Sequence, residues 1–98
     1  MSNINDSESV ADKYRAFSAA WDAYAYSQRC KSDARNDADY AGERLRFLKT
    51  DAAFKAHNDA LSLALKAADK AETNRIAYLN SLDIYKEAVE MEKAKRKQ

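Results

Sequence analysis

Cys30 and His57 are the residues of this sequence best suited to nucleophilic catalysis, and each is the single member of its type. A thiol beside an imidazole becomes a nucleophile because the imidazole accepts the thiol proton. Such a pair also needs backbone donors that stabilise an oxyanion and a group that orients the imidazole. The sequence contains one glycine and shows no motif that would supply either. We therefore interpret Cys30 as a small apolar filler and His57 as a turn or surface residue, and we predict no catalytic residues and no enzymatic activity.

Metal and cofactor sites are predicted to be absent. A structural zinc site takes about four Cys or His ligands, and this chain has two such residues. Asp37, Asp39 and Gly42 stand at the first, third and sixth positions of a calcium-binding loop. Ala41 and Leu48 occupy its fifth and twelfth positions, where that loop needs oxygen ligands. A single glycine also excludes a glycine-rich phosphate-binding loop.

The C-terminal tail is the candidate for contact with nucleic acid. Its basic residues are Lys93, Lys95, Arg96 and Lys97. These side chains can neutralise backbone phosphates without reading bases. Glutamates at 87, 90 and 92 precede them, and positive charge also suits the unsatisfied carbonyls at a helix C-terminus. A nucleic-acid-associated protein is therefore the alternative functional interpretation.

Two tyrosines, Tyr26 and Tyr40, share no stripe with larger apolar neighbours in a chain that holds six Tyr and one Trp. Arg29 and Arg44 lie close to them in the sequence. Exposed aromatic rings beside arginines match the composition of the contacts that dominate binding at protein interfaces. The two tyrosines are therefore candidate interface residues. The alternative is that they lie across a turn and seal one end of a helical bundle.

The composition predicts helix almost throughout, because the chain has no proline and is rich in Ala, Lys, Glu, Leu and Arg. Asn5 with Glu8 resembles a capping box, so a first helix is expected to begin near Asp6. Large side chains then recur at spacings of four, three, four and three, at Val10, Tyr14, Phe17, Trp21 and Tyr24. This spacing predicts one buried stripe on an amphipathic helix.

Two helix boundaries are expected inside the chain. The polar segment 27–39 competes for backbone hydrogen bonds, which predicts a break near 30–36. The second break falls either at Thr50, which can cap a helix, or near Asn58, and the later site is preferred. An echo of residues 16–23 at 53–60 favours the earlier one. The predicted helices are roughly 6–31, 34–56 and 59–95.

The larger apolar residues of the second and third helices are expected to face the core. In the second helix this face comprises Ala38, Ala41, Leu45, Leu48 and Ala52, widened by Phe47 and Phe54. In the third it comprises Leu61, Leu65, Ala68, Ile76, Leu79, Leu82 and Val89. Gly42 either admits a neighbouring helix closely or weakens its own by roughly 1 kcal/mol.

The predicted fold is all-α: one domain over residues 1–98, a small antiparallel bundle of about three helices with coiled-coil-like packing. The alternative is two long helices in a helical hairpin. In the three-helix arrangement the last helix extends beyond the second and leaves part of its apolar face uncovered. The uncovered residues would be Leu79, Leu82, Tyr85 and Val89. A second copy, giving a homodimer, or a different protein is expected to cover them.

The charge balance, 17 basic against 16 acidic residues, gives no overall bias toward nucleic acid or an anionic membrane. No apolar run suits a membrane span or a secretory signal, and one cysteine fits a reducing compartment, so we expect a cytoplasmic protein without a membrane partner. The leading expectation is a non-enzymatic protein-binding module, an adaptor or an inhibitor that occludes a partner's surface. Such compact helical proteins would suit host-directed inhibitors encoded by phages or mobile elements.

Overall fold

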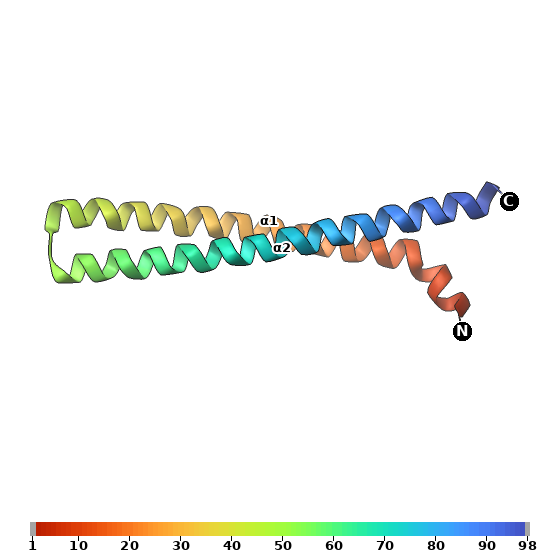
Figure 1. Ribbon diagram of the computed structural model, residues 1–98, viewed down its shortest axis with the longest axis horizontal. Coiled ribbons are helices and arrows are strands. Elements are labelled where there is room, and N and C mark those ends of the chain that lie inside the picture. Colours follow the sequence, from red (N-terminus) through yellow and green to blue (C-terminus); the bar gives the residue numbers. More distant parts are fainter. Residues whose placement is uncertain (1, 98) are drawn as a thin grey trace. The chain divides into compact units, whose positions relative to one another are not determined.

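The computed structural model describes the backbone of residues 2–97 and the side chains of residues 10–96. This part of the chain forms two α-helices, α1 (Ser2–Leu48) and α2 (Asp51–Lys97), which pack as an antiparallel hairpin (Figure 1). The all-α prediction is confirmed, in the form of the helical hairpin. The three-helix arrangement is wrong, because the breaks expected near 30–36 and Asn58 both lie inside continuous helix. Without proline, the polar segment 27–39 has no residue that must end a helix.

The connection between the helices is only two residues long, Lys49 and Thr50. The Lys49 amide donates to the Leu45 carbonyl at 2.9 Å, and Lys49 has φ 51°, the left-handed geometry that commonly ends helices. The Thr50 hydroxyl accepts the Ala53 amide at 3.1 Å, so Thr50 is the N-cap of α2. The boundary therefore falls at the earlier of the two predicted sites.

The start of α1 also differs from the sequence prediction. The helix begins at Ser2 rather than near Asp6. The side chains of Asn5 and Glu8, which were expected to form a capping box, lie outside the described residues.

The chain packs as two compact units. Unit 1 combines the segment up to Tyr24 with the segment from Asn74 onward, and unit 2 is Ala25–Thr73, which contains the turn. Each unit therefore consists of one stretch of α1 and one stretch of α2, and each is described separately below.

In each unit a seam of side chains faces the partner helix; in unit 2 the α2 seam is mostly alanine, and in unit 1 it also contains tyrosines. In α2 the residues protected from solvent recur at alternating spacings of four and three, a heptad pattern typical of coiled coils. The residues on this line are Ala53, His57, Ala60, Ala64, Ala67, Ala71, Asn74, Tyr78, Ser81, Tyr85, Ala88 and Glu92, and three half-buried residues lie beside it: Ala68, Leu82 and Val89. The most deeply buried of the described side chains are all small: Ser27, Ala38, Ala71 and Ala88. Small seam residues allow two helix backbones to approach closely.

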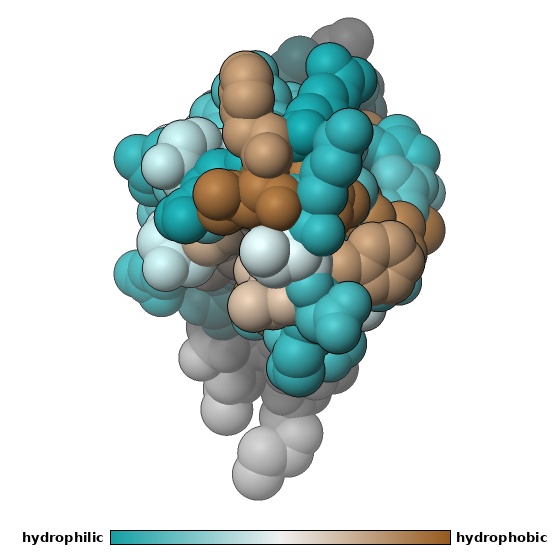
Figure 2. Space-filling model, turned by 90° about the vertical axis from the view of Figure 1, so that its left-hand side faces the viewer, coloured by the Kyte–Doolittle hydropathy of each residue, from teal (hydrophilic) through white to brown (hydrophobic). Residues whose placement is uncertain are grey.

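Most of the larger apolar side chains lie outside this seam, which corrects the predicted core. The exposed ones include Phe47, Leu48, Phe54, Leu61, Leu65, Ile76 and Leu79. Tyr14 and Trp21 of the predicted α1 core are about half exposed, but their rings contact Tyr85 and Tyr78 of α2. Side-chain size did not predict the buried face, because in unit 2 alanines occupy most of the α2 positions that face α1, and leucines lie beside them. Figure 2, which looks onto the end that carries the turn, shows hydrophobic residues at the surface among hydrophilic ones.

The predicted overhang of the last helix is also wrong. It assumed a short middle helix, whereas α1 and α2 each have 47 residues. Leu82, Tyr85 and Val89 are half-buried, and Leu79 is exposed. Within residues 2–97, no helix is apolar over a sufficient length to cross a membrane.

Candidate functional site

Unit 1 is held by a cluster of aromatic rings, the aromatic cluster. Its members are Tyr14, Phe17, Trp21 and Tyr24 of α1 and Tyr78 and Tyr85 of α2. The Tyr78 ring lies 5.1 Å from Trp21, 5.5 Å from Phe17 and 5.7 Å from Tyr24, measured between centroids. At these separations, aromatic pairs contribute stabilising free energy in addition to that gained by burying their surface. The Asn74 amide also donates to the Ala23 carbonyl at 3.4 Å, so unit 1 combines aromatic and polar contacts between the helices.

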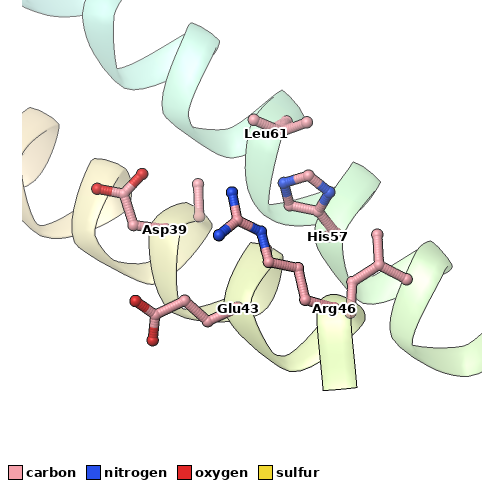
Figure 3. A pocket seen from close by; sticks show the side chains of 8 residues that line it. Asp39, Glu43, Arg46, His57 and Leu61 are labelled. Atoms are coloured by element: carbon pink, nitrogen blue, oxygen red, sulfur yellow. The ribbon is translucent and has the colours of Figure 1, made fainter. Parts of the chain in front are cut away.

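Unit 2 has a groove on one side of its seam, which we call the Gly42 flank. The groove has a volume of about 520 Å³ and is lined by Ala38, Asp39, Gly42, Glu43, Leu45, Arg46, His57 and Leu61. Figure 3 shows Asp39, Glu43 and Arg46 on α1 and His57 and Leu61 on α2. The rim therefore carries charges of both signs beside an apolar floor.

Gly42 determines how closely His57 approaches α1. A methyl group built at Gly42 would lie 3.1 Å from His57 Nε2, tighter than an ordinary contact. The absence of a side chain therefore makes room for the imidazole, which agrees with the predicted role of Gly42 in close helix approach. The ring is half-buried at the seam, so His57 is a packing residue and not part of a turn.

The opposite side of unit 2, the Tyr40 flank, carries the predicted tyrosine and arginine residues. A shallower groove of about 350 Å³ is lined by Tyr40, Ala41, Arg44, Leu48, Thr50, Ala52, Ala53 and Ala56. Further along α1, the Arg29 guanidinium lies 6.0 Å from the centroid of the Tyr26 ring, within reach of a cation–π contact.

The predicted interface residues fall into separate places. Tyr40 and Arg44 line one groove, and Tyr26 and Arg29 contact each other. The two tyrosines are 14 residues apart, which corresponds to roughly 21 Å along a helix. Of the predicted residues in unit 1, Tyr85 packs against Tyr14 and Phe17, so it belongs to the aromatic cluster. The binding role of all these residues stays a prediction.

The cations of the tail lie next to carboxylates of the same helix. Lys93 Nζ is 3.7 Å from Glu90, and Arg96 Nε is 3.8 Å from Glu92. Lys95 is exposed, and the side chain of Lys97 lies outside the described residues. Exposed ion pairs of this kind contribute little energy, so they would not prevent these cations from contacting phosphate. That contact stays a prediction. The arrangement adds no observation in its favour.

The residues with catalytic or metal-binding potential are not brought together. His57 lies against Gly42, and Cys30 precedes Gly42 by 12 residues on α1, which is roughly 18 Å of helix. Cys30 is half-buried and is not in a disulfide. Among the side chains that the structure describes, no group of three or more His, Cys, Asp or Glu could hold a metal ion.

Sequence reasoning missed the central position of Tyr78 and the pairing of Gly42 with His57. The signal was present in the alternating four-and-three spacing, which places His57, Tyr78 and Tyr85 on one line with the alanines of α2. Comparisons with known protein families, with curated proteins and with solved structures find no match.

Proposed function

We propose that this chain is a non-enzymatic protein-binding module, a small adaptor or an inhibitor that acts by covering a partner's surface. The observation that carries the proposal is a row of exposed aromatic side chains on α1, the α1 stripe. It consists of Tyr26, Tyr40 and Phe47, whose exposed fractions are 64%, 62% and 87%. Single exposed hydrophobic residues are ordinary, and it is their alignment along one surface that indicates a contact site.

The spacing of the α1 stripe places its three rings on one face. They are separated by 14 and 7 residues, and a helix in a coiled coil repeats its face every seven residues. Arg29 and Arg44 flank the stripe. Tyrosine and arginine are enriched among the residues that carry most of the energy of protein interfaces.

The mechanism that this surface supports is steric. The stripe stands on a helix that is already folded, so binding does not require a segment of backbone to become ordered. When a partner packs across these rings, the part of its surface in contact with them is covered and is no longer available to other molecules. Nucleic-acid binding remains the alternative, and its dependence on salt distinguishes it, because phosphate neutralisation weakens steeply as salt concentration rises.

The test is affinity capture from the native host with three proteins: the wild type, a Tyr26→Ala/Tyr40→Ala variant, and an Ile76→Ala control. Ile76 is also exposed, but it belongs to α2 and is not a member of the stripe. We expect the wild type and the control to capture the same protein, and the double variant to bind it at least about tenfold more weakly, since each lost hot spot costs about 2 kcal/mol.

Two outcomes would contradict the proposal. One is that the double variant captures the same protein with unchanged affinity. The other is that the captured material is nucleic acid and dissociates steeply with added salt, which would support the alternative.

A further inference from the structure

We infer that the Gly42 flank of unit 2 is a self-association surface for a second copy of this chain. Tyr26, Tyr40 and Phe47 are not among the residues that line this groove. On α2, Leu65 follows the seam residue Ala64 by one position, whereas Leu63 precedes it by one. Successive residues of a helix are rotated by about 100°, so Leu63 and Leu65 stand on opposite sides of the seam. The inference therefore does not depend on the α1 stripe, and either can fail alone.

The accessible surface of the chain is large enough to accommodate a second copy. The chain has an accessible surface of 7779 Å², whereas a compact folded monomer of 11.1 kDa exposes roughly 5,700 Å². The difference, about 2,000 Å², exceeds the roughly 800 Å² that each partner contributes to a standard protein interface. Exposed Leu61 lines the groove. Phe54 and Leu65, also exposed, lie seven residues before it and four residues after it, spacings that keep them on the same side of α2, so part of the excess is apolar and available for burial.

The shape of the Gly42 flank is complementary to itself. A two-fold interface uses the same patch on both subunits, so the patch must contain both a protruding part and a hollow that receives it. The hollow is the groove beside Gly42 and His57. The protruding part is Leu65, which is 68% exposed and lies eight residues from His57 on the same helix.

One placement of the axis brings these parts together. We place a two-fold axis perpendicular to α2 at the level of Leu61. Each residue of one copy then faces the residue of the other copy that is equally far from Leu61 in the opposite direction, so the two residue numbers add up to 122. Leu65 of each copy then lies at the level of the other copy's His57 and its groove. The same operation sets the large Phe54 opposite the small Ala68. On each side of the axis, Leu65 thus meets the groove beside His57, and Phe54 meets an alanine.

The charges of α1 agree with this placement. Gly42 lies at the level of His57, so Ala38 lies at the level of Leu61, and both line the groove. The axis then brings the second copy's Arg35 to the level of Ala41. This position lies between two acidic residues of the groove, Asp39 and Glu43, so opposite charges face each other across the interface.

The first experiment compares molar masses of the purified full chain by sedimentation equilibrium from micromolar to near-millimolar concentration. The variants are Leu65→Glu and, as a matched control, Leu63→Glu, a leucine of the same helix that is 61% exposed on the opposite side of the seam. We expect dimers for the wild type and Leu63→Glu. Leu65→Glu should raise the dimer dissociation constant about 100-fold or more, because it would replace an apolar contact by a carboxylate that must lose its water on association. Circular dichroism checks that both variants keep their helix content.

The second experiment tests the position of the axis. A residue on a two-fold axis meets its own copy, so Leu61→Cys in a Cys30→Ala chain should form an intermolecular disulfide on mild oxidation, and Leu63→Cys should not. A monomeric wild type at all concentrations, or a dimer that Leu63→Glu dissociates as readily as Leu65→Glu, would overturn the inference. A dimer that cross-links through residue 63 and not through residue 61 would also overturn it. All of these measurements use the purified chain alone, so they leave the proposed binding function untouched.

Discussion

At the scale of single residues, Tyr78 of α2 connects the two helices of unit 1 through three aromatic contacts. Its ring contacts Phe17, Trp21 and Tyr24 of the other helix. Tyr78→Ala removes all three pairs and leaves a gap that the seam cannot close, so we expect it to lower the free energy of unfolding by about 3 kcal/mol. Urea unfolding followed by the fluorescence of Trp21, the single tryptophan, measures this loss directly at the affected contact.

Tyr26→Ala is the matched control for this measurement. Tyr26 also lies inside a helix, but it is exposed and its ring lies 6.0 Å from the guanidinium of Arg29 on its own helix. We expect this variant to change the free energy of unfolding by no more than about 0.5 kcal/mol. Equal losses for Tyr78→Ala and Tyr26→Ala would mean that the aromatic cluster does not hold the helices together.

At the scale of elements, the turn contains a residue in a conformation that its side chain disfavours. Lys49 has φ 51°, and a residue with a Cβ is less stable in the left-handed region by about 1 kcal/mol or more. Glycine has no such cost there, although it loses more conformational freedom on folding. We therefore expect Lys49→Gly to raise the free energy of unfolding by about 0.5 to 1 kcal/mol, measured by urea unfolding at fixed protein concentration.

A second lysine-to-glycine change separates this local effect from a general one. Lys66 is exposed inside α2, where glycine is less stable than other residues by about 1 kcal/mol. Lys66→Gly should therefore lower the free energy of unfolding. If both substitutions lowered it, the left-handed geometry of Lys49 would not be limiting the stability of the turn.

The helical class of these elements could be predicted from the sequence, whereas their number and their buried face could not. The absence of proline and the alanine-rich composition predict helix regardless of its partners. The break between helices depends on one left-handed lysine and one threonine cap, Lys49 and Thr50, and neither residue type is specific to turns. The competing site at Asn58 offered an equally good cap in sequence terms.

The buried face was mispredicted because hydrophobicity alone favours the largest side chains. Ala64 and Ala71 lie on the seam, while Leu61 and Leu65 stand beside it. Only the distance between the backbones decides which set faces inward, and that distance is a property of the packed pair of helices. The candidate surfaces follow from the same fact, since leucines excluded from the seam become available for contact with another molecule.

At the scale of the whole molecule, the hairpin buries less surface than a compact domain of its mass. Its 7779 Å² of accessible surface leaves it with less hydrophobic stabilisation per residue than a compact chain, because that stabilisation is roughly proportional to the apolar area removed from water. Association through the Gly42 flank would recover part of this deficit. Folding and association are then linked, so stability must depend on protein concentration.

Because folding and association are linked, the urea midpoint of a dimer depends on protein concentration, whereas that of a protein that stays monomeric does not. For a dimer that dissociates on unfolding, a tenfold increase in chain concentration adds about 1.4 kcal/mol to the unfolding free energy of the dimer, so the urea midpoint of the wild type should rise with concentration. Its slope against urea should exceed that of Leu65→Glu, because more surface becomes exposed on unfolding. The midpoint of Leu65→Glu should stay constant, and that of Leu63→Glu should follow the wild type. A wild-type midpoint that is independent of concentration would show that the hairpin reaches its stability alone.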